Sequence, residues 1–301
     1  MKNMFLLLAG VLILGSCSEN TSGMRYETGN YYVSCLLKAG AFIDGENSVK
    51  VGKTQDIENA QWDMLADSTA QVKIKEISPN STVTGEVLLT WKEELRAYID
   101  ADGVMPINEK NTYELEVVTK NGQIITASTT VPQAIEVLGD SQYSEEPVWA
   151  FEVIDDEWLE LELETADAEH PVQIRTLDDE EFNLYTEFWC LEDVENAEYT
   201  FPEGDNDYPA DNEEYMGDTH QYPRRLRNFF MFQPENGIVN YNSYQADLKF
   251  YGRFRMKVYS IDENYLSYLY KADGYEHGGI EGGIGVFGSC CGRELYTRVV
   301  K

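Results

Sequence analysis

Residues 112–132, TYELEVVTKNGQIITASTTVP, decide the fold of this chain. In their first half, apolar residues alternate with acids, which gives an extended strand one apolar and one charged face. Asn121-Gly122 is a pair that a two-residue type I′ turn favours, and β-branched residues then lead to Pro132, which cannot donate to a strand ladder. The stretch therefore predicts an antiparallel hairpin closed by a type I′ turn.

Similar patterns come before the hairpin. Short apolar or alternating runs occupy 31–37, 70–77 and 82–91, and turn residues divide them. Short strands at close spacing, without a long helical period, are typical of antiparallel sandwiches. We therefore expect residues 24–135 to form an Ig/fibronectin-like antiparallel β-sandwich.

A second β-rich domain with one short helix is expected over residues 136–301, because the chain exceeds the commonest domain size. Ser260-Ile261-Asp262-Glu263 has the S-x-x-E form of a capping box, and Asp273-Gly274 ends the helical pattern that follows it. Strands are predicted at 158–163, 171–177, 229–232, 248–259 and 294–300.

The N-terminus has the pattern of a bacterial lipoprotein signal. Its apolar run, residues 4–14, is shorter than the roughly 20 residues that a helix needs to span a bilayer. Leu14-Gly15-Ser16-Cys17 follows and resembles a lipobox. We expect residues 1–16 to be a cleaved signal peptide, Cys17 to bind outer-membrane lipid through its acylated thiol, and residues 17–23 to form a tether. An ordinary signal peptide with an accidental cysteine is the alternative.

Ser18-Glu19-Asn20, directly after Cys17, partly matches the signal that sends Bacteroidota lipoproteins to the cell exterior. This favours exposure at the cell surface over a periplasmic location.

The composition is strongly acidic, with 23 Lys+Arg against 54 Asp+Glu and a net charge of −31. A charge of this sign disfavours nucleic acid as a partner and argues against a body lying flat on anionic lipid. We expect a soluble body held at the membrane by its anchor. Four cysteines beside Cys17 permit disulfides in three connectivities, between which the sequence does not decide: Cys35, Cys190, Cys290 and Cys291.

Residues 178–218 form an acidic excursion, and loops of this length in compact domains are usually functional or disordered. Spaced carboxylates suit Ca²⁺, which prefers oxygen ligands, but the glycine and terminal glutamate of an EF-hand loop are absent. We expect no cofactor. Ca²⁺ is the one candidate ion, and a solvated acidic loop without a bound ion is the simpler alternative. The candidate metal ligands are Asp205, Asp207, Asp211 and Glu213.

Aromatic and basic side chains flank the acidic excursion. The aromatic residues could stack on a sugar or a peptide, although a place in the core is the simpler interpretation. The arginines could bind an anionic ligand, although pairing with the neighbouring acids is the simpler interpretation. The candidate ligand-binding residues are Tyr185, Phe188, Trp189, Tyr199, Arg224, Arg225 and Arg227.

Gly283-Ile284-Gly285-Val286-Phe287-Gly288 matches G-x-G-x-x-G, but 13 residues follow it, too few for the helix and acidic residue of a dinucleotide site. We expect instead a backbone that bends or packs closely. The sequence has no G-x-S-x-G, P-loop or paired C-x-x-C motif, so we expect no enzymatic activity.

Several motifs occur in a characteristic order over nearly the whole chain. They are the segments 31–39, 70–74, 112–117, 125–132, 258–269 and 282–288. Together they resemble a family of Bacteroidota outer-membrane lipoproteins, the domain of unknown function 4249. Cys290-Cys291 and the acidic excursion depart from that pattern. The resemblance implies an outer-membrane setting, often beside TonB-dependent transporters, and supplies no catalytic residues.

We therefore expect a non-enzymatic, lipid-anchored accessory or ligand-capture component of a TonB-dependent transporter complex, with the outer-membrane barrel as its partner. Two other classes stay open. One is a structural or adhesive surface protein with sandwiches as spacers, and the other is a glycan or peptide hydrolase that acts through carboxylates.

Overall fold

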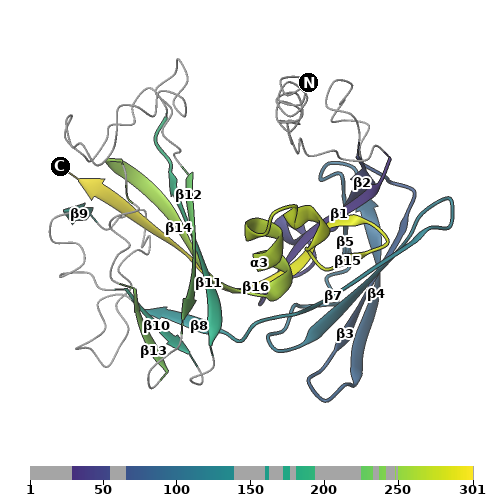
Figure 1. Cartoon of the computed structure of the whole chain (residues 1–301), viewed down its shortest axis with the longest axis horizontal. Coiled ribbons are helices and arrows are strands. Elements are labelled where there is room, and N and C mark those ends of the chain that lie inside the picture. Colours follow the sequence, from purple (N-terminus) through teal and green to yellow (C-terminus); the bar gives the residue numbers. More distant parts are fainter. Residues whose placement is uncertain are drawn as a thin grey trace, which may run out of the picture.

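A computed structural model describes residues 29–54, 66–138, 160–162, 172–176, 181–193, 225–232, 237–241, 248 and 250–300. This part of the chain is mainly β, as predicted, and it forms two layered bodies with a helix between them (Figure 1). Within the described ranges, no helix has the length and apolar composition needed to cross a bilayer.

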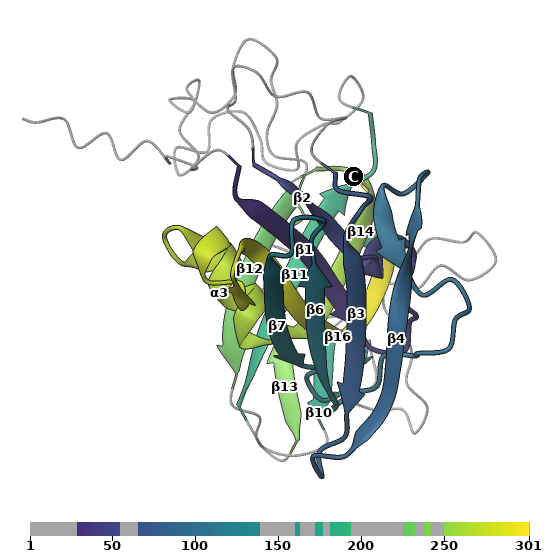
Figure 2. The same cartoon turned by 90° about the vertical axis from the view of Figure 1, so that its right-hand side faces the viewer.

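The first sandwich has a six-stranded antiparallel sheet of order β15-β7-β6-β3-β4-β5. Its strands are β3 (Gln71–Ile77), β4 (Val83–Lys92), β5 (Ala97–Ile99), β6 (Thr112–Val118), β7 (Ile124–Thr130) and β15 (Ile280–Glu281). β1 (Tyr31–Lys38) and β2 (Lys50–Lys53) lie behind this sheet, and Figure 2 shows them beyond β7, β6, β3 and β4.

Period-two alternation buries one face of β1, β3, β6 and β7. Every second residue of β1, β3 and β6 enters the core, and an apolar side chain buried in this way stabilises the fold by about 1.5–3 kcal/mol. The fully buried members include Val33, Leu37, Val72, Ile74, Tyr113, Val117, Ile125 and Phe287.

The hairpin at 112–132 is present, but its turn is not type I′. Thr119 and Gln123 are hydrogen-bonded across the loop, and the Gly122 N–H donates to the Thr119 carbonyl at 2.9 Å. Gly122 has φ +83°, whereas Asn121 is not among the residues with positive φ. This pattern fits a three-residue loop, in which a type I turn is followed by a left-handed glycine. The prediction of a type I′ turn was wrong because that turn needs positive φ at both central residues.

The long strand β16 (Ile284–Val300) joins the two sandwiches. Its first half pairs in parallel with β1, and its second half pairs antiparallel with β14 (Gly252–Ile261). The resulting sheet has the order β12-β11-β14-β16-β1-β2, with β9 (Glu160–Glu162) beside β16. The boundary expected near residue 135 therefore divides the sequence but not this sheet.

The glycine-rich segment lies inside β16. A Cβ on Gly285 would meet the carbonyl oxygen of Val33 on the neighbouring strand, and one on Gly292 would meet that of Val258. The expectation of close backbone packing is confirmed here. The strand begins ten residues before the predicted 294–300. The first part was not predicted because glycine has little strand propensity.

The second sandwich packs the β12-β11-β14-β16 part of that sheet against a three-stranded sheet of order β13-β10-β8. Its further strands are β8 (Ile135–Leu138), β10 (Val172–Thr176), β11 (Phe182–Cys190), β12 (Arg225–Phe232) and β13 (Ile238–Tyr241). Its core includes Ile174, Leu184, Phe188, Phe254, Met256 and Val258.

The predicted helix is α3 (Glu263–Tyr270), which packs on the outer face of the seven-stranded sheet. Its N-cap is Asp262, whose side chain accepts from the Tyr265 N–H. The capping box on Ser260 was wrong, because Ser260 lies within β14 and its hydroxyl donates to the carbonyls of Gln133 and Cys291.

All four cysteines in the described part of the chain are buried free thiols. None of the disulfides that the sequence permitted is present among them. Burial raises the pKa of the Cys290 thiol to about 12, which makes it a poor nucleophile at neutral pH.

Candidate functional site

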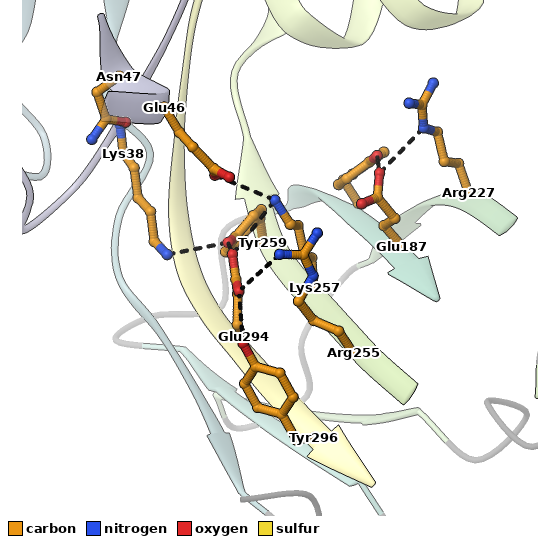
Figure 3. A network of polar contacts seen from close by, with 11 residues as sticks. Lys38, Glu46, Asn47, Glu187, Arg227, Arg255, Lys257, Tyr259, Glu294 and Tyr296 are labelled. Atoms are coloured by element: carbon orange, nitrogen blue, oxygen red, sulfur yellow. Dashed lines mark hydrogen bonds and ion pairs between the residues drawn. The ribbon is translucent and has the colours of Figure 1, made fainter. Parts of the chain in front are cut away.

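Strand pairing gathers charged and aromatic side chains on the outer face of the second sandwich. Arg227, Glu187, Lys257 and Glu294 are aligned across β12, β11, β14 and β16. Trp189, Arg255 and Tyr296 form the next row. We call this surface the basic–aromatic face, and define it as Lys38, Tyr185, Glu187, Trp189, Arg227, Arg255, Lys257, Tyr259, Glu294 and Tyr296. Figure 3 shows all of these except Trp189 and Tyr185 with labels.

Glu294 is the centre of the larger group of contacts. Its Oε1 accepts from the Tyr259 hydroxyl at 3.0 Å and lies 3.5 Å from Lys257 Nζ. Its Oε2 accepts from the Tyr296 hydroxyl at 3.4 Å and lies 3.9 Å from an Arg255 nitrogen. Lys38 Nζ in turn donates to the Tyr259 hydroxyl at 3.1 Å, so three cations surround one carboxylate.

These contacts set the ionisation of the group. Burial alone would raise the pKa of the Glu294 carboxyl, but the charge of Lys257 and the hydrogen bond from Tyr259, with the two further cations, hold it below its ordinary value. Burial, and after it the charge of Glu294, raises the pKa of Tyr259. Glu294 is therefore an anion and Tyr259 a neutral donor at neutral pH.

A second carboxylate lies two strands away. The Glu187 side chain is 2% exposed, and its Oε2 accepts from the Tyr185 hydroxyl at 2.8 Å and from Arg227 Nε at 3.2 Å. Burial raises the pKa of Tyr185, so its hydroxyl stays a donor to Glu187. Arg227 thus pairs with an acid of the same face, Glu187.

Trp189 and Arg255 form a stacked pair on the same face. The Arg255 guanidinium carbon lies 4.7 Å from the centre of the Trp189 ring, which is cation–π geometry. Stacking fixes the guanidinium in place between the Trp189 ring and the Glu294 carboxylate. The face therefore combines cations and aromatic rings that its own contacts already hold in position.

Three of the residues singled out in the sequence, Tyr185, Trp189 and Arg227, lie together on this face. Phe188 lies on the opposite side of β11, 1% exposed in the core. β12 pairs Arg225 with Trp189, and the side chain of Arg225 lies outside the described atoms. Other predicted site residues also lie outside the described ranges: Cys17, Tyr199, Asp205, Asp207, Asp211, Glu213 and Arg224.

The other seven members of the face were missed in the sequence: Lys38, Glu187, Arg255, Lys257, Tyr259, Glu294 and Tyr296. A signal for three of them was present, because Arg255, Lys257 and Tyr259 alternate with buried residues in β14. Nothing local pointed to Lys38, which reaches Tyr259 from a strand more than 200 residues away in the sequence.

Two hollows lie near α3, away from these contacts. One holds about 530 Å³ beside β3, β6, β7 and β15. The other holds about 540 Å³ between the two sandwiches, where residues 128–133, 181–183 and 261–264 meet. Within the described ranges, no three His, Cys, Asp or Glu side chains are placed to hold a metal ion.

Comparisons with other proteins give one family. Residues 21–291 match the family described as "Domain of unknown function (DUF4249)". No curated protein matches the sequence.

Three solved structures show a weak likeness, and each comparison covers 90% of this chain. Trypsin-activated alpha-2-macroglobulin from Escherichia coli is 9% identical with a TM-score of 0.20, and 15% of its chain is covered. A bacterial 1.5-MDa ice-binding adhesin is 9% identical with a TM-score of 0.19 and 64% covered. Salmonella alpha-2-macroglobulin reacted with methylamine is 7% identical with a TM-score of 0.21 and 14% covered.

Proposed function

The chain belongs to the family described as domain of unknown function 4249, and we propose that it is a non-enzymatic accessory that captures a ligand for a TonB-dependent outer-membrane transporter. In this proposal Cys17 carries the lipid that anchors the chain in the outer membrane. The body then stands at the cell surface, beside the transporter barrel, and needs no cofactor.

The observation that carries the proposal is the basic–aromatic face. In a chain of net charge −31, it gathers Lys38, Arg227, Arg255 and Lys257 beside the half-buried rings of Trp189 and Tyr296 and the buried rings of Tyr185 and Tyr259. Cations and rings on one surface are suited to ligand contact, because they combine charge complementarity with stacking. The side chains come from four neighbouring strands and from β1, so the sheet holds them in fixed positions.

Affinity purification of the tagged, acylated protein from native membranes in mild detergent tests the proposal. An outer-membrane barrel should co-purify with it. The matched control is the Cys17→Ala variant, which should lose both its membrane location and the barrel. Recovery of the lipoprotein without a barrel would refute the transporter role.

A structural or adhesive surface protein is the second candidate, and β16 favours it. One strand that runs through both sandwiches makes a stiff spacer. This function predicts that deletion of the gene abolishes attachment of cells to a surface, and that no transporter component is recovered with the protein.

A further inference from the structure

Glu46 differs from the other acids around the basic–aromatic face. Its side chain is 81% exposed, whereas that of Glu294 is 22% exposed. It projects from the short 3-10 turn Gly45–Asn47 between β1 and β2, and its Oε2 lies 3.5 Å from Lys257 Nζ (Figure 3). An ion pair with so exposed an acid stabilises a protein little, since solvent screens it. Glu46 is therefore an anion that another anion can displace.

The cations beneath Glu46 outnumber the acids, and the excess grows without Glu46. Lys38, Arg255 and Lys257 contribute three positive charges, and Glu294 and Glu46 contribute two negative charges. Removal of Glu46 leaves two uncompensated cations, one of which, Lys257, is 14% exposed. Partly buried charges interact more strongly than fully solvated ones, so this position favours a replacement anion.

We propose that a carboxylate of an acidic carbohydrate displaces Glu46 and pairs with Lys257, with Glu46 holding the position when the ligand is absent. The aromatic neighbours favour a sugar over a simple anion. Trp189, Arg255 and Tyr296 form the row of the sheet next to Lys257 and Glu294. Flat rings and hydroxyl groups are the chemistry that a uronic acid residue contacts. This inference rests on the proposed function, because it names the ligand class of the same face.

The test is a calorimetric titration of the full chain after its signal segment with oligogalacturonate. A neutral oligosaccharide of equal length and a polyglutamate peptide serve as comparison ligands. Glu46→Gln should bind oligogalacturonate about two- to fivefold more tightly than the wild type, because the internal competitor is lost. Lys257→Met should bind it about tenfold more weakly or worse. Added salt should weaken the binding of both the wild type and Glu46→Gln.

The first sandwich supplies matched controls. Lys73 and Glu86 form an exposed pair at 4.0 Å on the six-stranded sheet, so Glu86→Gln and Lys73→Met change the same charges elsewhere. Both should leave affinity unchanged. Equal tightening by Glu86→Gln would show an effect of net charge alone and would overturn the inference. So would the absence of tightening in Glu46→Gln, or binding of the neutral oligosaccharide or the peptide as tight as that of oligogalacturonate.

These outcomes are separate from those of the membrane purification. Recovery of a barrel together with absent oligogalacturonate binding would overturn this inference and leave the accessory role standing. Oligogalacturonate binding that follows the predicted order, without a barrel, would refute the transporter role and leave the site standing.

Discussion

At the scale of single residues, Asp262 joins three parts of the chain. Its Oδ1 accepts from the N–H groups of Tyr265 at 3.1 Å and Ser289 at 3.0 Å, and its Oδ2 accepts from the Thr129 hydroxyl at 2.6 Å. One carboxylate thus caps α3 and ties β7 of the first sandwich to β16. Its loss would leave the backbone N–H groups of Tyr265 and Ser289 without this acceptor.

Substitution of Asp262 separates the hydrogen bonds from the charge. Asp262→Ala should lower the free energy of unfolding by about 2–4 kcal/mol, because it removes an N-cap and leaves buried donors unsatisfied. Asp262→Asn keeps an acceptor oxygen and should cost far less at neutral pH. Urea unfolding measures both. Equal losses for the two variants would show that the hydrogen bonds are not what stabilises this joint.

The charge of Asp262 should appear in the pH dependence of stability. Burial raises the pKa of this carboxyl, and the hydrogen bonds from Thr129 and from three backbone N–H groups offset the rise in part. The folded chain therefore takes up the proton at a higher pH than the unfolded chain does. The stability contribution of the group is fully present below the unfolded pKa and is lost as the pH rises through the folded pKa.

Asp262→Asn has no titrating group at this position. The unfolding free energy of this variant relative to that of the wild type should therefore be highest at neutral pH. As the pH falls toward the ordinary pKa of aspartate, the wild type should gain stability relative to Asp262→Asn, so the cost of the substitution should grow. Urea unfolding at a series of pH values checks this. A difference that stays constant with pH would contradict the account of Asp262.

At the scale of elements, β1, β3, β4, β6 and β7 could be predicted from the sequence, because their signals are local, whereas the short strands β2, β5 and β15 were not predicted. The hairpin strands at 112–118 and 124–130 lie where they were predicted. The turn between them and the helix cap were wrong, because several residues there fit more than one turn or cap. The first half of β16 was missed because its partner β1 lies about 250 residues away, and its glycines show no apolar alternation.

In the candidate site, too, only the features with a local sequence signal could be predicted. Tyr185, Trp189 and Arg227 were singled out from their local composition. Their position beside Lys257 and Glu294 depends on the register of β11 with β14 and of β14 with β16, which no local pattern contains.

The pairing of β1 with β16 can be tested at two glycines. Gly285 has φ +116° and no room for a Cβ beside the Val33 carbonyl, whereas Gly122 has φ +83° and open space around it. Gly122→Ala should cost about 1–2 kcal/mol, the penalty for a left-handed alanine. Gly285→Ala should cost clearly more, since the strands must also separate. Thermal unfolding of both variants checks this, and equal costs would contradict the close approach of β1 and β16.

At the scale of the whole molecule, β16 makes the two sandwiches depend on each other. Phe287 is buried in the first core although it comes from the C-terminal segment, and β15 extends the first sheet. Residues 24–135 alone therefore lack the strand beside β1 and part of their core.

We expect a fragment of residues 24–135 not to fold stably by itself, while the full chain unfolds with the two sandwiches coupled. Circular dichroism and amide exchange of the fragment measure this. Restoration of structure by an added peptide of residues 278–301 would support the same account. A fragment that is folded and protected without the peptide would contradict it.

We propose that this chain works by contact, as the anchored partner of an outer-membrane barrel. Native mass spectrometry of the complex released from its own membranes tests this most directly. The account predicts a particle of defined stoichiometry that contains the acylated chain and one barrel protein. A particle that contains the acylated chain alone, under conditions that keep other barrel complexes intact, would contradict it.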